Sequence, residues 1–494
     1  MRAMRIEPTI LTAAMLAAGS THLACPARAA DALPSWRWVR TVAPQHATPG
    51  SFGAAVSSSD GRLWIGPSRD LDVGDGPPQV TAVGILAGFG LPGSGDSLAA
   101  HPDADRSAGF GLALAASHDA CVVGSPHAGC RRRGCDTGQA HLVTPAHDGT
   151  WSVDEVACPE PEPASEFGAA VATDGTTIVV GSPRFDGDGT AVDSGAVDVY
   201  RLGPAPDRLV THVARLRPPA PATGARFGSA VAVDGDWIAI GEPGAGPTLP
   251  RAGAVHLAHR APEGTWSHHA SLRTPAGAQG WLGASLALAD GELLAGAPVA
   301  RDPARRIAAG AVAHFHLRDG AWTLRRVVHG NDLGAGAGFG QALAIADGWG
   351  AVGAPGEDAG AEDAGAAFAL ELRSGRLRRI EAPSPRAGAG FGAGLAFGTG
   401  AAGVAIGPQR FLAIAGRADP EVPAIPGMVE LYGLRAAAPV LVTRRASQAQ
   451  EPPPPRSRGP RPPSPSPPTR PSRPTAAIPP RPRAPRHPPR SGAR

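Results

Sequence analysis

The sequence contains no lysine, so all 46 of its basic residues are arginine. A P-loop needs a lysine to reach phosphate, and a Schiff-base enzyme needs a lysine amine, so both chemistries are excluded. Aromatic residues amount to only 5%, and tyrosine occurs only as Tyr200 and Tyr432. Glycine and proline are abundant, at 66 and 54 residues. This balance indicates short strands joined by many tight turns.

Long apolar runs are also scarce, and we predict no membrane span. At the N-terminus, Arg2 and Arg5 precede an apolar stretch from Ile10 to Ala18, and Ala27-Arg28-Ala29 fits an A-x-A cleavage site. We interpret residues 1–29 as a signal peptide, which predicts a secreted, periplasmic or cell-surface protein. Lipidation of Cys25 is an alternative, although His22 stands where a branched apolar residue is expected.

The charge is unevenly distributed along the chain. Residues 451–494 contain ten arginines and one acidic residue, so a net charge of +3 overall leaves −6 on the rest. A mildly acidic main part argues against a nucleic-acid partner. Residues 436–494 are rich in Pro, Arg and Ser, and we predict a disordered tail because they carry too little apolar surface to fold.

Three markers repeat seven times between these two ends, 52 to 60 residues apart. The first is an apolar residue followed by glycine, the second resembles Gly-Ala-Pro, and the third resembles Gly-Ala-Val. In six copies the second glycine follows the first by 13 residues. The first markers are Phe52-Gly53, Phe110-Gly111, Phe167-Gly168, Phe227-Gly228, Leu282-Gly283, Phe339-Gly340 and Phe391-Gly392.

Each repeat predicts four antiparallel strands. An Asp-Gly pair such as Asp290-Gly291 suits the tight hairpin between the first two strands. The second strand is a buried run such as Trp237-Ile238-Ala239-Ile240, and the fourth often opens with tryptophan, as at Trp266. Radial stacking of such sheets buries both faces, so we predict an all-β, seven-bladed β-propeller over residues 30–435.

The last blade is predicted to close with a strand from the other end of the chain. Its own strands are expected near 392–397, 404–407 and 428–434, with no Trp-led fourth strand after them. The segment Trp36 to Val42 directly precedes the first Phe-Gly, as a fourth strand should. We therefore expect it to complete blade seven and remove the open edge.

The three markers resemble the FG-GAP repeat of integrin-α-like β-propellers, in the short bacterial form, from about Trp36 to Leu434. The resemblance implies a binding module whose loops contact partners. In the integrin form, a calcium loop lies between Phe-Gly and Gly-Ala-Pro. Here that interval holds only a short turn, as at Thr173-Asp174-Gly175-Thr176.

Acidic residues gather instead between the second and third strands. Asp186, Asp188 and Asp193 alternate with glycine, a pattern that can wrap Ca²⁺, and we name them as a speculative calcium site. Solvated acidic turns are the alternative, and no other cofactor is predicted. A second acidic group comprises Glu357, Asp358, Glu362 and Asp363, and a third comprises Asp70, Asp72 and Asp75.

Four cysteines fall in the second repeat, and export permits disulfides. We predict a Cys130–Cys135 bridge, with Cys158 as a competing partner and unpaired thiols as the alternative. His141, His256, His314 and His316 lack a metal-binding spacing and are interpreted as ordinary strand residues.

No catalytic residue is predicted, because the repeat spacing is even and no long loop carries clustered acids, histidine or tyrosine. We expect a monomeric, non-catalytic binding, adhesion or structural module that presents loops to an extracellular protein or glycan. The alternative is a propeller lyase or hydrolase that acts on extracellular polysaccharide.

Overall fold

The computed structural model describes residues 35–435 with gaps, and its regular structure there is entirely β-strand. Residues 1–34, 436–494 and the following positions lie outside the described set: 43–54, 60–61, 67–78, 85–96, 101–108, 129–136, 147–149, 188, 206, 247–250, 276–279, 303, 305, 331, 400–409 and 417–427. Among the residues it does describe, no helix is long and apolar enough to cross a membrane.

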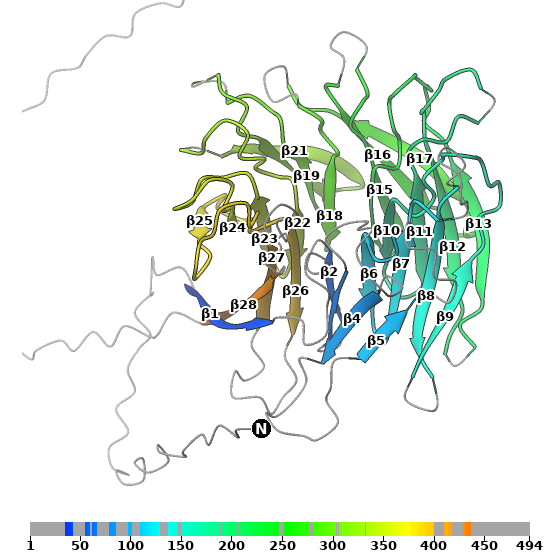
Figure 1. Ribbon diagram of the computed structural model, residues 1–494. Helices are drawn as coiled ribbons and strands as arrows, with labels where there is room; N and C mark the ends of the chain where they lie inside the picture. Colours follow the sequence, from blue (N-terminus) through cyan, green and yellow to red (C-terminus); the bar gives the residue numbers. More distant parts are fainter. Residues whose placement is uncertain are drawn as a thin grey trace, which may run out of the picture. The chain divides into compact units, whose positions relative to one another are not determined.

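The strands form four-stranded antiparallel sheets, seven in number, which we call blades 1 to 7 (Figure 1). Blades 1 to 3 comprise β2 (Val56–Ser59), β3 (Arg62–Ile65), β4 (Gln79–Gly84) and β5 (Ser97–Ala100); β6 (Ala113–Ser117), β7 (Ala120–Ser125), β8 (Gln139–Pro145) and β9 (Trp151–Val156); and β10 (Ala170–Thr173), β11 (Thr177–Ser182), β12 (Ala196–Leu202) and β13 (Val210–Leu216).

Blades 4 to 6 continue the same order along the chain. They comprise β14 (Ala230–Asp234), β15 (Trp237–Glu242), β16 (Ala254–Arg260) and β17 (Trp266–Leu272); β18 (Ser285–Ala289), β19 (Glu292–Ala297), β20 (Ala311–Arg318) and β21 (Ala321–His329); and β22 (Leu343–Ala346), β23 (Trp349–Ala354), β24 (Ala366–Glu371) and β25 (Leu377–Ile380). The first strands of successive blades contact one another in a closed cycle, as in a β-propeller.

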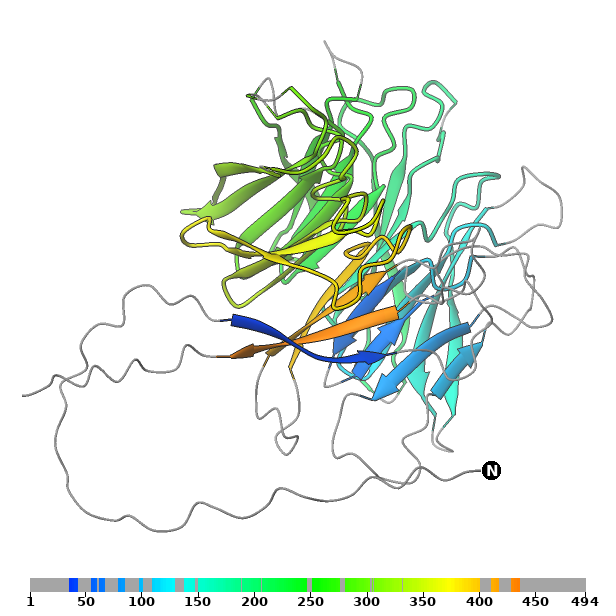
Figure 2. The same cartoon turned by 60° about the vertical axis from the view of Figure 1, so that its left-hand side comes forward.

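Blade 7 joins the two ends of the described chain. It holds β26 (Gly394–Thr399), β27 (Arg410–Gly416), β28 (Met428–Arg435) and β1 (Ser35–Val42), and β1 pairs antiparallel with β28. Figure 2 shows the blue β1 lying along the orange end of the chain. The prediction that an N-terminal strand completes the last blade is confirmed.

The second strand of blade 7 was wrongly predicted. The sequence indicated residues 404–407, ending in Gly407-Pro408, but β27 runs over Arg410–Gly416. The Gly392 N–H donates to the Ala415 carbonyl at 2.9 Å, so Ala415 takes the place that a Gly-Ala-Pro glycine has elsewhere. The longer and more apolar run pairs with β26, and sequence spacing misplaced it because Gly-Pro is frequent in this chain.

The three sequence markers meet at the junctions between blades. Within a blade, the Gly228 N–H donates to the Gly241 carbonyl at 2.9 Å. Between blades, the third-marker glycine forms a parallel bridge with the next Phe, as Gly195 does with Phe227. Phe227 itself is buried. The three sequence markers therefore contact one another mainly through main-chain groups. The side chains at the other positions of each repeat can differ without breaking these contacts.

Tryptophans pair across three of these junctions. The ring centroids of Trp64 and Trp151 lie 4.8 Å apart, and those of Trp237 and Trp322 lie 5.6 Å apart. Each pair joins the second strand of one blade to the fourth strand of the next. Trp36 on β1 contacts Trp349 at 6.4 Å in the same way, so β1 acts as a regular fourth strand.

Candidate functional site

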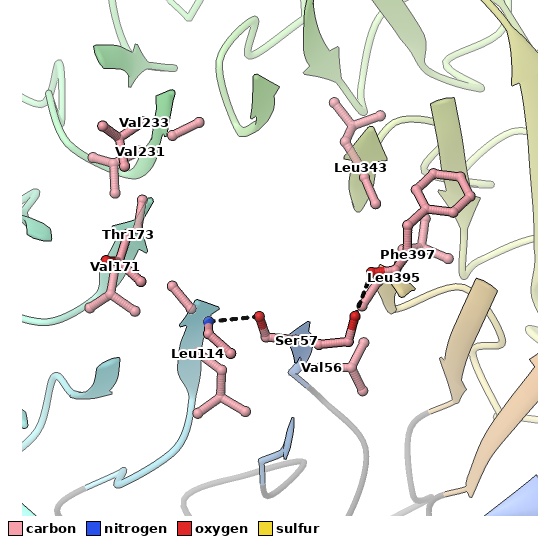
Figure 3. Close-up of a pocket in the computed structure, with 17 residues that line it drawn as sticks. Val56, Ser57, Leu114, Val171, Thr173, Val231, Val233, Leu343, Leu395 and Phe397 are labelled. Carbon is pink, nitrogen blue, oxygen red and sulfur yellow. Dashed lines mark hydrogen bonds between the residues drawn. The ribbon is translucent and has the colours of Figure 1, made fainter. Parts of the chain in front are cut away.

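A cavity of about 290 Å³ lies on the axis of the closed cycle of first strands. Its lining comes from β2, β6, β10, β14, β22 and β26 and consists of aliphatic side chains, Phe397 and three hydroxyl residues, Ser57, Ser58 and Thr173. Figure 3 shows Val56, Leu114, Val171 and Leu343 around this space. Because the first strands crowd together at the axis, small residues such as Ala115 and Ala172 occupy many of these positions.

Two of the hydroxyls serve to join neighbouring blades. Ser57 Oγ accepts a hydrogen bond from the Ala116 N–H at 2.9 Å, and Ser58 Oγ donates to the Phe397 carbonyl (Figure 3). The described lining carries no side chain that titrates near neutral pH. This cavity is therefore suited to packing or to an apolar guest, rather than to acid–base chemistry.

In the predicted acidic loop of blade 3, the Asp186 carboxylate is turned toward the backbone of the same loop. Asp186 Oδ1 accepts a hydrogen bond from the Asp193 N–H at 2.6 Å, and Asp193 has a φ of 54°. Glu162 accepts from the Asp186 N–H at 3.3 Å. Asp188 lies outside the described residues. Within the part of the chain that is described, no group of three or more His, Cys, Asp or Glu side chains forms a metal site.

The acidic loop of blade 6 uses the same turn. Asp358 Oδ1 accepts from the Asp363 N–H at 2.9 Å. Glu357 is buried, and its carboxylate accepts from the Gly334 N–H at 3.1 Å and pairs with Arg379 at 3.2 Å. These carboxylates accept main-chain hydrogen bonds and so stabilise the loop conformation. Asp70, Asp72 and Asp75 lie outside the described residues.

Two of the five cysteines are described, and both are free thiols. Cys121 is fully buried, which raises the pKa of its thiol beyond the usual range. Cys158 is half-buried, and its Sγ lies 4.0 Å from Arg215 Nη2. Cys130 and Cys135 lie outside the described residues, so the disulfide hypothesis stays a prediction.

The histidines singled out in the sequence are strand residues with polar neighbours. His256 Nε2 lies 2.7 Å from Glu242 Oε2, and His256 Nδ1 lies 2.9 Å from Ser271 Oγ. His314 Nε2 lies 2.5 Å from Glu292 Oε2. His141 and His256 also stack against Phe110 and Phe227, at 5.5 and 5.3 Å between ring centroids.

The Ser271–His256–Glu242 chain has the order of groups found in hydrolase triads. The equivalent positions of blade 3 hold a different pair, because Asp198 faces Arg215 just as His256 faces Ser271. Asp198 is fully buried, and its Oδ2 lies 2.7 Å from Arg215 Nη2. We therefore interpret His256 and Ser271 as the pair of polar residues that blade 4 places between its third and fourth strands, where blade 3 has Asp198 and Arg215.

The buried Asp198–Arg215 pair was missed in the sequence. Arg215 also pairs with Glu160 of blade 2 at 2.7 Å and lies over the ring of Phe185, 4.7 Å from its centroid. Tyr200 reaches the same neighbour, since its hydroxyl donates to the Ala157 carbonyl at 2.8 Å. Tyr432 repeats this contact between blades 7 and 6, through the Glu381 carbonyl at 2.7 Å. Both tyrosines therefore connect neighbouring blades.

Comparison with known proteins adds one family match. Residues 210–258 match the model of the FG-GAP repeat. This segment runs from β13 through the first three strands of blade 4 and contains all three markers. The chain is a β-propeller that contains an FG-GAP repeat.

The remaining comparisons of this FG-GAP β-propeller are more distant. No curated protein matches the sequence. Among solved structures, the Neurospora crassa Pan2 WD40 domain is similar at 11% identity and a TM-score of 0.45, covering 82% of this chain and 96% of that chain.

Proposed function

We propose that this FG-GAP β-propeller is a secreted or cell-surface binding or adhesion module. Seven blades form a rigid monomeric frame, and the loops of one face bind an extracellular protein or glycan without catalysis. Residues 1–29 direct export, and residues 451–494 are strongly basic in sequence. The proposal treats the blades as scaffold and the loops as the variable part.

The observation that supports this proposal is that the contacts between blades recur, whereas the loop residues next to them differ. The contacts that hold blades together are main-chain hydrogen bonds and buried rings, and they recur from blade to blade. The residue just before the Phe-Gly marker differs between blades: it is Glu166, Arg226 and Trp281 in blades 3 to 5 and glycine in blades 2, 6 and 7. A frame that recurs from blade to blade, with loops that differ, is typical of binding scaffolds.

The axial cavity favours binding over the alternative enzyme. Its described lining contains no acid or base. Of its three hydroxyls, those of Ser57 and Ser58 bond between blades, and that of Thr173 accepts from the Gly175 N–H within its own hairpin. A polysaccharide hydrolase needs a pair of carboxylates about 5 to 10 Å apart around the scissile bond. A lyase likewise needs a positioned base.

The test is binding of the full chain to arrays of extracellular glycans and proteins. We expect saturable binding to at least one class, with no release of reducing ends or unsaturated sugars from the bound polysaccharide. Turnover of that polysaccharide would favour the enzyme instead. Absence of binding across both arrays, with the chain folded by circular dichroism, would reject the binding proposal.

Export is tested separately from binding. Expression of the full sequence with its first 29 residues should place the protein outside the cytoplasm. We expect a mature N-terminus near Ala30, whereas retention of Met1 in a cytoplasmic fraction would contradict this part of the proposal.

A further inference from the structure

The residue before each Phe-Gly marker has a left-handed backbone wherever it is described. Glycine fills the position in blades 2, 6 and 7, at Gly109, Gly338 and Gly390. Blade 5 has Trp281 there, with a φ of 63°. A left-handed backbone costs a non-glycine residue about 1–2 kcal/mol. Glu166 and Arg226 share this conformation in blades 3 and 4, so it belongs to the repeat, and blade 5 differs in placing an aromatic ring there.

Trp281 lies in the connection between β17 of blade 4 and β18 of blade 5. Trp281 is 37% exposed. Its main-chain N–H donates to the main-chain carbonyl of Arg251, in the β15–β16 loop, at 3.1 Å. The Arg251 guanidinium lies over the indole, with Cζ 5.8 Å from the ring centroid. The preceding Gly280 packs against the backbone of Val299 and Ala300. Val299 is itself 40% exposed.

The same two positions in blade 3 hold an ordinary ion pair. Glu166 precedes that blade's Phe-Gly, and Arg184 follows its Gly-Ser-Pro. Their side chains lie 3.2 Å apart. Blade 5 replaces this pair with Trp281 and Val299, which leave apolar surface open to solvent. The repeat alone therefore does not require an aromatic ring here.

Exposed arginines lie on the two loops that carry this apolar surface and its neighbour Arg251. Arg251 forms no ion pair with any described carboxylate, and Arg301 and Arg306 are exposed on the loop after Val299. The acid of that loop, Asp302, is buried and accepts a hydrogen bond from the Ala304 N–H at 2.7 Å. Arg251 therefore offers a guanidinium beside the ring, and the loop after Val299 adds two exposed arginines.

We infer that Trp281, Val299 and the arginines around them bind an acidic polysaccharide built from uronic acids. The indole takes the C–H face of a pyranose ring, and Arg251 pairs with the sugar carboxylate. One indole and one valine suit a single sugar unit, whereas a standard protein interface buries about 800 Å² on each partner. This inference rests on the proposed binding function and names the ligand class of one site.

The test compares three full-length proteins: the natural sequence, Trp281→Gly and Arg226→Gly. Glycine accommodates the left-handed backbone, so both variants should fold. Arg226 has the same backbone conformation in blade 4, with a φ of 58°, and serves as the matched control. The probes are polygalacturonate, neutral dextran and poly-glutamate. All three proteins carry the same basic tail, and poly-glutamate reports its contribution.

We expect Trp281→Gly to weaken binding to polygalacturonate about tenfold, with Arg226→Gly unchanged. Binding to poly-glutamate should be equal in all three proteins. Equal affinity of the natural protein for polygalacturonate and poly-glutamate would overturn the inference, because charge alone would then explain binding. An unchanged affinity in Trp281→Gly would also overturn it, as would a Trp281-dependent protein partner without polysaccharide binding.

These outcomes separate the site from the general function. If the natural protein binds other arrayed glycans or proteins but not polygalacturonate, the general binding function is retained and the Trp281 site is rejected. If the natural protein binds nothing on either array, both the general binding function and the Trp281 site are rejected.

Discussion

The main-chain carbonyl of Gly283 occupies the space where a side chain on Gly241 would begin. Gly241 ends the second strand of blade 4, and Gly283 belongs to the Phe-Gly position of blade 5. The same approach recurs from Gly181 to Gly228 and from Gly353 to Gly392. Neighbouring blades are thus close enough that only glycine fits, and this contact sets their spacing.

Gly241→Ala should therefore destabilise the protein strongly. Its Cβ meets a main-chain carbonyl that cannot rotate away, and we expect the free energy of unfolding to fall by about 3 kcal/mol. Gly264→Ala is the control, because Gly264 has open space around it and the substitution costs only the left-handed backbone, about 1–2 kcal/mol. Urea unfolding of both variants measures the difference. Equal losses would show that the junction is not sterically closed.

Trp36→Ala tests closure of the ring by β1. Trp36 is buried and contacts Trp349 and Phe397, at 6.4 and 5.8 Å between ring centroids. Its removal should lower the free energy of unfolding by about 3–5 kcal/mol. Trp38→Phe is the control, since Trp38 is half exposed and loses only its hydrogen bond to Glu430, worth about 1 kcal/mol. A wild-type stability for Trp36→Ala would contradict the role of β1.

We expect the folded protein to lose stability on mild acidification because of His314. Burial lowers the pKa of His314, and Arg325 and Arg326 lower it further, while Glu292 opposes the shift. The folded protein therefore keeps His314 neutral at pH values where the unfolded chain, with a pKa of about 6.5, binds a proton. Stability contributed by this residue is present above that value and is lost as the pH falls below it.

The variant His314→Gln isolates this contribution. Glutamine does not titrate and can still donate to Glu292, so its melting temperature should depend less on pH between about 7 and 5. Parallel thermal scans of the two proteins measure the slope. Identical slopes would assign the acid sensitivity to other groups.

Calcium binding by Asp186, Asp188 and Asp193 stays a prediction with a direct test. If Ca²⁺ binds there, millimolar Ca²⁺ should raise the melting temperature relative to chelator, and Asp188→Asn should abolish the rise. Asp358→Asn is the control, because it alters the equivalent turn of blade 6 and should leave the calcium response intact. No response to Ca²⁺ in the natural protein would exclude the site.

Local patterns sufficed for much of the fold. Alternating apolar runs between Gly and Pro located most strands, because a strand needs only a buried face and a turn at each end. Asp290 and Asp347 adopt left-handed turns, with φ values of 54° and 52°, as the Asp-Gly pairs predicted. The pattern failed at β27, where a Gly-Pro pair outside the strand imitated the marker at its end.

Side-chain partners were much less predictable. Asp198 and Arg215 are 17 residues apart, and their pairing depends on the register of β12 with β13. Arg251 and Trp281 belong to loops of different blades, and they meet only because the blades pack side by side. No spacing rule connects such residues, since the distance between them is set by the ring rather than by the chain.

The sequence by itself determined the repeat, the strand order within each blade and the closing strand at Trp36. These depend on local backbone preferences and on apolar periodicity, which are written in consecutive residues. Tertiary structure alone decided which polar groups are satisfied, which lie on the loop face and that Trp281 is held exposed beside Arg251. Those properties arise where separate blades meet, because only the folded ring fixes the distances and burial that define a site.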